Sequence, residues 1–200
     1  MKTSFDAIIM GAGPAGSTAA ILLARAGWKV ALVEKQRFPR RKVCGECIAA
    51  SNLPLLDALG IGPQVDASAG PALRQVALMH GTRTVVAELP PAAHARHVWG
   101  RALGRETLDS LLLAQAGSAG AVVLQPWSVQ SFGGPAGNHR CDVRAVDSPH
   151  TMALRAPVLI AAHGSWEALP SDRASRHLVR RASALFAFKA NFSGATLAAG

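Results

Sequence analysis

The chain has 200 residues, half of them hydrophobic, which is enough for a sizeable core and excludes a largely disordered chain. The formal net charge is +9, yet the basic residues form no long block, no basic stretch is interleaved with aromatics, and tyrosine is absent. This pattern argues against a nucleic-acid surface, so we interpret the charge as a composition bias.

The cysteines and the apolar runs bear on location. Cys44, Cys47 and Cys141 are too few for the disulfide framework of a small secreted protein. The apolar run after Lys2 is short and leads straight into glycines, unlike a signal peptide, and no run is long enough to span a bilayer. We expect a cytoplasmic protein, with peripheral membrane contact left open and no nucleic-acid partner.

The N-terminal stretch up to Glu34 has the pattern of a βαβ dinucleotide-binding unit. An apolar run ending at Met10 leads into a Gly-x-Gly-x-x-Gly turn, a small-residue helix follows, and a second apolar run ends at Glu34. Gly11 allows the tight turn, Gly13 lets the backbone approach a pyrophosphate, and Gly16 lets the helix lie close to the sheet. The helix start favours phosphate, and the Glu34 carboxylate can accept a hydrogen bond from a ribose hydroxyl.

The remaining elements follow from hydrophobic periodicity and turn residues. In the first half we predict strands over 5–10 and 29–34, helices over 14–26 and 48–59, a basic loop over 35–47, a loop over 63–71, a hairpin over 73–79 and 84–89, and a short extended piece over 98–100. In the second half we predict a helix over 105–119, strands over 121–124, 127–132, 140–146, 151–155 and 157–161, a helix over 173–181 and a β-like stretch over 185–192.

This order of elements predicts an α/β fold, a parallel sheet with an antiparallel β-meander packed on one side. The buried-strand pattern, apolar throughout rather than alternating, supports the parallel sheet for the strand that ends at Glu34.

Four motifs occur in a fixed order along the chain. They are the Gly-Ala-Gly-Pro-Ala-Gly turn with Glu34, the Arg-Lys-Val-Cys-Gly-Glu stretch at 41–46, the Gly-Arg-Glu-Thr-Leu-Asp helix start at 104–109, and the Leu-Ile-Ala-Ala-His-Gly-Ser segment at 159–165. Over residues 5–165 this order resembles the FAD-dependent oxidoreductases of the geranylgeranyl reductase and para-hydroxybenzoate hydroxylase superfamily, to which the flavin halogenases are related. The resemblance implies a Rossmann-like FAD-binding domain and the start of a β-rich substrate domain.

The resemblance also implies roles for individual residues. The FAD pyrophosphate would lie on Gly11, Ala12, Gly13, Pro14, Ala15 and Gly16, and the adenosine ribose on Glu34 with Lys35 beside it. Arg41, Cys44 and Gly45 would lie along the flavin, Arg105 near the FAD phosphates or ribityl chain, and Ala162, His163 and Gly164 would form a turn that supports the FAD. No residue is assigned as a catalytic acid or base, and no metal site is expected.

Two departures from the family pattern stand out. His163 occupies the place where the family usually has aspartate, which leaves the role of this side chain open. A further Gly-Asp motif would come after residue 200, so we interpret the chain as a fragment of a longer protein, with a truncated and inactive product as the alternative. We assign 1–165 to the FAD-binding domain, with 71–100 contributing to the substrate side, and 166–200 to the start of an incomplete substrate domain.

The expected function is that of an FAD-dependent oxidoreductase reduced by NAD(P)H, most simply a monooxygenase that hydroxylates a small apolar or aromatic molecule. A geranylgeranyl-reductase-type reduction, a flavin halogenation, an inert FAD-binding module and a simple NAD-dependent dehydrogenase stay as alternatives. The substrate and the oligomeric state are left open.

Other residue patterns have simpler interpretations. Cys44-x-x-Cys47 could be a redox dithiol or half of a zinc site, but we favour a flavin-loop Cys44 and a buried Cys47 that caps the next helix. His94 and His97 share one loop, and we interpret them as surface histidines because no acid or thiolate is near in sequence. The arginines of 173–181 are interpreted as a solvated face, with an NADPH phosphate or an acidic carrier protein as the minority alternative.

The predicted ribose contact can be tested by substitution. Glu34→Ala is expected to weaken FAD binding by about 1–3 kcal/mol, because the loss of a buried acceptor leaves its polar partner unsatisfied. Titration of the purified protein with FAD measures this change, and an unchanged dissociation constant would count against the ribose role.

Overall fold

A computed structural model describes residues 3–93 and 96–164 of the chain, in two compact units. The first unit contains the described residues of 1–40 and 108–184, and the second contains those of 41–107. Each unit is described by itself.

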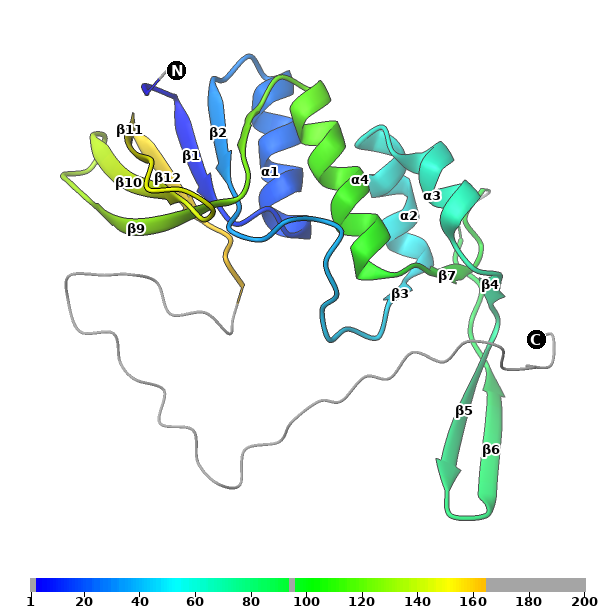
Figure 1. The fold of residues 1–200 in the computed structure, drawn as a ribbon. Helices are drawn as coiled ribbons and strands as arrows, with labels where there is room; N and C mark the ends of the chain where they lie inside the picture. Colours follow the sequence, from blue (N-terminus) through cyan, green and yellow to red (C-terminus); the bar gives the residue numbers. More distant parts are fainter. Residues whose placement is uncertain (1–2, 94–95, 165–200) are drawn as a thin grey trace. The chain divides into compact units, whose positions relative to one another are not determined.

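The first unit is built on a parallel sheet (Figure 1). Its strands are β1 (Ala7–Met10), β2 (Val30–Val33), β8 (Val122–Leu124) and β12 (Val158–Ala161), and they lie in the order β12-β1-β2-β8. β1 pairs in parallel with both β2 and β12, and every residue of β1 and β2 is buried. The predicted parallel sheet is therefore confirmed, and its uniformly apolar strands reflect burial on both faces.

Two helices connect these strands. α1 (Pro14–Arg25) joins β1 to β2 and contacts both strands, and α4 (Arg105–Ser118) precedes β8. Both helices end at a glycine with positive φ, Gly27 at +86° and Gly120 at +105°, a conformation that lets the chain leave a helix at little cost. The predicted helices are confirmed, each ending one residue earlier than expected.

An antiparallel meander packs on one face of the parallel sheet. It comprises β9 (Trp127–Gly133), β10 (His139–Ala145) and β11 (Thr151–Ala156) in the order β11-β10-β9. The turn between β9 and β10 uses Gly134 at φ +112°, which explains the glycine-rich sequence there. The meander predicted from the sequence is confirmed.

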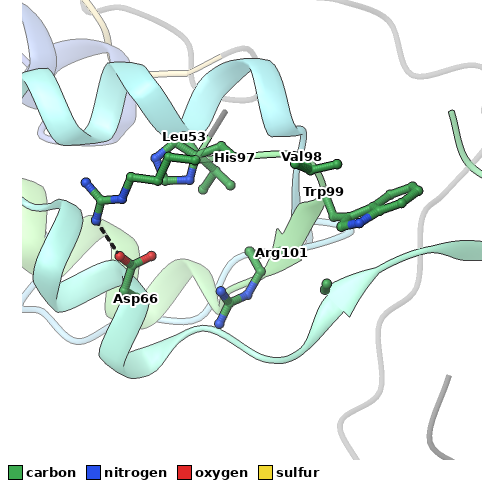
Figure 2. Close-up of a pocket in the computed structure, with 8 residues that line it drawn as sticks. Leu53, Asp66, His97, Val98, Trp99 and Arg101 are labelled. Carbon is green, nitrogen blue, oxygen red and sulfur yellow. Dashed lines mark hydrogen bonds and ion pairs between the residues drawn. The ribbon is translucent and has the colours of Figure 1, made fainter. Parts of the chain in front are cut away.

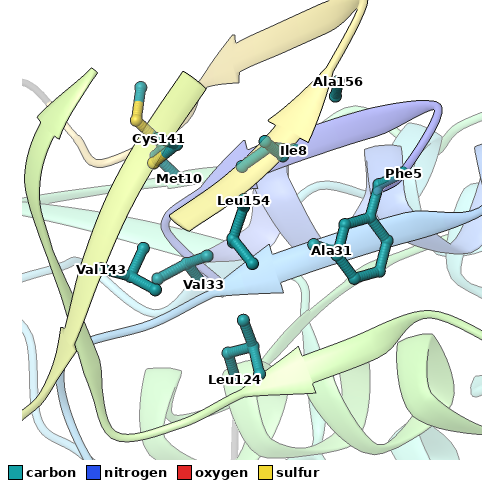
Figure 3. Packing of buried hydrophobic residues seen from close by; sticks show 10 residues of the cluster. All are labelled: Phe5, Ile8, Met10, Ala31, Val33, Leu124, Cys141, Val143, Leu154 and Ala156. Atoms are coloured by element: carbon teal, nitrogen blue, oxygen red, sulfur yellow. The ribbon is translucent and has the colours of Figure 1, made fainter. Parts of the chain in front are cut away.

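The shared core of the two sheets follows from strand alternation (Figure 3). Ile8 and Met10 of β1 point toward the meander, where they pack with Cys141, Val143 and Leu154. The alternate residues of β1 and β2 are equally buried and point to the opposite face, because successive side chains of a strand alternate.

The second unit combines short strands with short helices. A small antiparallel sheet has the order β3-β7-β4 and consists of β3 (Cys47–Ile48), β7 (Gly100–Ala102) and β4 (Ala72–Leu73). The helices are η1 (Ala50–Asn52), α2 (Leu53–Ala58) and α3 (Gly62–Ser68). The hairpin of β5 (Gln75–His80) and β6 (Arg83–Glu88) pairs as predicted, and all its residues are exposed, including Leu78 and Met79.

Three sequence-based expectations in this unit were wrong. The helix expected over 48–59 is split into β3, η1 and α2, and the extended piece expected over 98–100 lies further along, in β7. The loop expected over 63–71 contains α3, because Pro63 falls in the first helical turn, where its missing N–H costs nothing, and Val65 is buried. The elements expected over 173–181 and 185–192 lie outside the described residues.

The buried thiol of Cys141 gives a test of the meander core. Burial raises the pKa of this thiol to about 12, and the neighbouring Asp142 carboxylate adds to the rise. Because the thiolate is the reactive form, a thiol reagent at about pH 8 is expected to modify the exposed Cys47 and to leave Cys141 unmodified until the protein unfolds.

Peptide mapping by mass spectrometry measures this difference. Denatured protein, in which all three thiols should react, is the control. Modification of Cys141 in the folded protein as fast as Cys47 would contradict the sheet packing described above.

Candidate functional site

In the glycine turn after β1, the backbone of Gly11 lies very close to the backbone of the segment that follows β12. Gly11 has φ +102°, and its N–H donates to the Val33 carbonyl over 2.8 Å, which continues the pairing between β1 and β2. A Cβ atom at Gly11 would lie 2.5 Å from the Ala162 carbonyl oxygen. Both the conformation and the crowding therefore require glycine at this position.

The same turn brings the start of α1 close to the sheet. A Cβ atom at Gly16 would lie 1.8 Å from the Gly11 carbonyl oxygen, so no side chain fits there. The N-cap residue, Gly13, has an extended backbone and provides no side-chain cap. The N–H groups of the first turn thus meet no capping side chain, which is the arrangement that receives phosphate in dinucleotide sites.

Glu34 lies against this turn. The residue as a whole is 6% exposed, and its Oε2 accepts a hydrogen bond from the Ala12 N–H over 3.0 Å. Its Oε1 accepts a second one from the Gln36 N–H over 2.8 Å. These bonds hold the carboxylate at the carboxyl end of β2, beside Lys35, at the edge where ligands of parallel α/β sheets bind.

The segment after β12 completes this edge of the first unit. The Ala162 N–H donates to the Met10 carbonyl over 2.8 Å, and Ala162 and the His163 backbone lie directly against Gly11. Gly164 has φ +94°. The His163 Nδ1 atom is buried and has no hydrogen-bond partner among the residues described. The structure therefore brings the predicted residues Gly11–Gly16, Glu34 and Ala162–Gly164 together.

Arg40 is a residue of this region that sequence reasoning missed. Its Nη2 atom lies 3.5 Å from Asp109 Oδ2 and 3.9 Å from Glu34 Oε2. Asp109 is fully buried on the same stripe of α4 as Leu112 and Ala116. A carboxylate at a core-facing helix position needs a polar partner, so the sequence could have marked Asp109 as paired, although it does not show which basic residue is the partner.

The remaining residues predicted to contact FAD lie in the second unit. The Arg41 Nε donates to Glu106 Oε2 over 3.3 Å in an exposed pair. The Arg105 N–H donates to Glu46 Oε1 over 3.0 Å, and Glu46 itself has φ +57°. Gly45 has open space where a Cβ would lie. The flavin roles of Arg41, Cys44, Gly45 and Arg105 stay predictions.

The expectation for Cys47 was wrong. Cys47 is exposed and lies in β3, where its Sγ donates to the Gly45 carbonyl, and Ala49 rather than Cys47 precedes η1. Cys44 is half-buried, and its sulfur accepts from the Glu46 N–H over 3.5 Å. A cysteine that pairs with β7 through its backbone cannot also occupy a helix cap.

The expectation for His97 was also wrong. His97 is 7% exposed, and its Nε2 lies 2.6 Å from Asp57 Oδ2 (distant in sequence, which is why the acid was overlooked). The Arg96 guanidinium bridges Asp57 and Asp66. Arg96, Asp66 and His97 line a pocket of about 450 Å³ together with Trp99. Figure 2 shows Asp66, His97 and Trp99 around this pocket. His94 lies outside the described residues, and within them no three His, Cys, Asp or Glu side chains gather in a metal-binding group.

Comparison with protein families assigns most of the chain to one family. A family model described as an FAD binding domain matches residues 4–178. The chain belongs to this FAD-binding domain family. The glycine turn, Glu34 and the segment after β12, which were predicted to bind FAD, all fall within the matched residues.

Curated relatives of the FAD-binding domain carry several chemistries. The chain is 48% identical over 67 residues to the tryptophan 2-halogenase of Chondromyces crocatus, a match that covers 34% of this chain and 13% of the halogenase. It is 42% identical over 66 residues to the menaquinone reductase of Mycolicibacterium smegmatis, covering 33% and 16%. It is 45% identical over 56 residues to the 6-methylpretetramide 4-monooxygenase of Streptomyces rimosus, covering 28% and 13%. The matches thus span less than a fifth of these relatives.

Solved structures share the fold. The myxobacterial chondrochloren halogenase CndH superposes with a TM-score of 0.72 at 20% identity, over 83% of this chain and 38% of the halogenase. The flavin-dependent monooxygenase PieE, solved in complex with FAD and substrate, superposes with a TM-score of 0.70 at 18% identity, over 82% and 31%. At these identities the likeness shows the Rossmann-like FAD-binding fold alone. In the described part of the chain, no helix is long and apolar enough to cross a bilayer.

The crowding at Gly16 gives a test of the glycine turn. Gly16→Ala places a Cβ against the backbone of Gly11, so the turn must move, and we expect a loss of stability of about 1–3 kcal/mol together with weaker FAD binding. Thermal denaturation and FAD titration measure the two effects.

A second helical glycine provides the matched control. A Cβ at Gly117 of α4 would lie 3.8 Å from a Val123 methyl group, which is ordinary contact. Gly117→Ala is therefore expected to keep FAD affinity and to keep or slightly raise stability, since alanine favours a helix more than glycine does. Equal behaviour of the two variants would contradict the close approach of α1 to the turn.

Proposed function

We propose that this chain forms the cofactor-binding part of an FAD-dependent oxidoreductase that takes electrons from NADH or NADPH and hydroxylates a small apolar or aromatic molecule. The proposal rests on the buried Glu34 carboxylate, hydrogen-bonded to Ala12 beside the glycine turn, in a chain that belongs to the FAD-binding domain family.

The residues present fit an FAD molecule. Gly11 and Gly16 have no room for a side chain, because Ala162 crowds Gly11 and the Gly11 carbonyl crowds Gly16. The turn therefore stays tight and the start of α1 lies close to the sheet, which is the geometry that receives a pyrophosphate in dinucleotide sites. Glu34 would accept from the adenosine ribose, and the exposed Lys35 beside it would add a positive charge. The orphaned Nδ1 of His163 marks a further polar atom at this edge for which the described residues offer no partner.

Bound FAD supplies the redox chemistry, and the protein contributes binding, orientation and electrostatics. The backbone of Gly11–Gly16 binds the inert pyrophosphate, and Glu34 orients the adenosine. The Ala162–Gly164 turn would support the cofactor from the end of β12. The roles predicted for Arg41, Cys44, Gly45 and Arg105 belong to the same proposal.

Hydroxylation is supported by the monooxygenase relative. Halogenation and double-bond reduction are the competing outcomes, supported by the halogenase and the reductase relatives. The cytoplasmic location, the absence of a nucleic-acid partner and the division at residue 165, with 71–100 on the substrate side, stay predictions.

Purification and reduction test the proposal. We expect the purified protein to bind FAD with the absorption spectrum of a flavoprotein, and NADH or NADPH to bleach that spectrum without oxygen. Incubation with aromatic test compounds and oxygen should then add one oxygen atom to a product, detected by mass spectrometry. The Glu34→Ala variant serves as the control with weakened cofactor binding.

Other results would overturn parts of the proposal. A colourless protein that binds NAD and not FAD would contradict the flavoprotein assignment. A protein that binds FAD but is reduced by neither NADH nor NADPH would support an inert FAD-binding module. A chlorinated or hydrogenated product would replace hydroxylation by halogenation or reduction.

A further inference from the structure

The side chain of Arg40 is buried between two carboxylates. It is 10% exposed and lies between Asp109, which is fully buried, and Glu34, which is 7% exposed. The shorter contact, 3.5 Å, is to Asp109, and the longer one, 3.9 Å, is to Glu34. The Phe38 ring lies 4.8 Å from the guanidinium carbon and limits the orientation of the guanidinium plane.

The position of Arg40 depends on Asp109, and the charge near Glu34 depends in turn on Arg40. A buried carboxylate on the core-facing side of α4 is stable only with a cation beside it, so Asp109 fixes the position of Arg40. Arg40 in turn presents positive charge to Glu34, the carboxylate that the Ala12 and Gln36 N–H groups already hold. Two carboxylates thus contact one guanidinium.

The guanidinium also has an unused donor. The Arg40 Nε atom is buried and has no hydrogen-bond partner among the described residues. Buried donors are rarely left without an acceptor, because each one costs free energy. This unpaired donor marks the surroundings of Glu34 as a polar site that the described residues do not complete.

We propose that Arg40 is a positioning residue of the nucleotide site, anchored by Asp109, and that it holds the Glu34 carboxylate in the orientation that accepts from the ribose 2′-hydroxyl. The inference rests on the proposed cofactor site and adds to it the residue pair that controls Glu34. Arg40 thereby determines how strongly the site prefers a ribonucleotide to a 2′-deoxyribonucleotide.

Calorimetric titration with ADP and 2′-deoxy-ADP isolates this step, since the two probes differ only at the hydroxyl that Glu34 would bind and neither contains a flavin. Because the 2′-hydroxyl would donate to a charged acceptor, we expect the unsubstituted protein to bind ADP at least about tenfold more tightly than 2′-deoxy-ADP. In Arg40→Met the ratio of the two dissociation constants should fall toward one, whereas Arg40→Lys should keep part of the preference.

Arg37→Met is the matched control, because Arg37 belongs to the same loop, is exposed, and pairs with Asp147. It should keep the full preference for ADP. If Arg40→Met alone fails to fold because Asp109 loses this ion pair, the double variant Arg40→Met/Asp109→Asn removes both charges together and should fold with the preference lost.

The outcomes separate the two levels of the proposal. Equal weakening of both nucleotides in the Arg40 variants, with the tenfold ratio intact, would show a merely structural role and overturn the inference while leaving the cofactor site in place. An unsubstituted protein that binds neither ADP nor FAD would overturn the cofactor site and the inference together. Loss of the ratio in the Arg40 variants and not in Arg37→Met supports both.

Discussion

The hydrogen bond from the Ala12 N–H to the Glu34 carboxylate joins the two ends of the βαβ unit. The parallel pairing of Met10 with Val33 brings the carboxyl ends of β1 and β2 to one edge, and the Gly11 N–H extends that pairing to the Val33 carbonyl. The turn and the acid then meet across 22 positions of sequence. Other parts of the first unit lie beside this contact. The start of α1 and the segment after β12 lie against Gly11, and the Arg40 side chain lies near Glu34.

Close backbone approach explains why this edge consists of glycine and alanine. The chain after β12 runs directly against Gly11, and α1 begins directly against the same residue, so there is no volume for side chains at Gly11 or Gly16. The turn and the start of α1 therefore present backbone N–H and carbonyl groups, and the Glu34 side chain lies beside them. Such a surface suits a phosphate-containing ligand, because it combines oriented dipoles with little steric hindrance.

Both units use an aspartate on a helix to hold a distant cation. In the first unit Asp109 of α4 pairs with the buried Arg40, and in the second unit Asp57 of α2 pairs with His97 and with the half-exposed Arg96. The burial of an ion pair determines how much stability the protein loses when one partner is removed. An exposed pair is screened by water and contributes little to stability, whereas removing the cation from a buried carboxylate strongly destabilises the fold. Asp109 and Arg40 are therefore tightly linked in a way that Arg96 and Asp66 are not.

The amino-acid sequence by itself determined the local units of this FAD-binding domain. Several elements were predictable because their signals lie within one turn, one helix or one strand. They are the Gly11–Gly16 turn, the apolar strands around it, helix α4 and the meander. The tertiary structure alone decided which distant charges meet. Arg40, Asp57 and Asp109 gain their partners from chain segments far away in sequence, and local periodicity contains no information about such contacts. The same reason explains the errors at Cys47 and His97, whose environments are set by β7 and α2. Burial of a charge or a thiol is a property of the packed chain, so only packing could assign it.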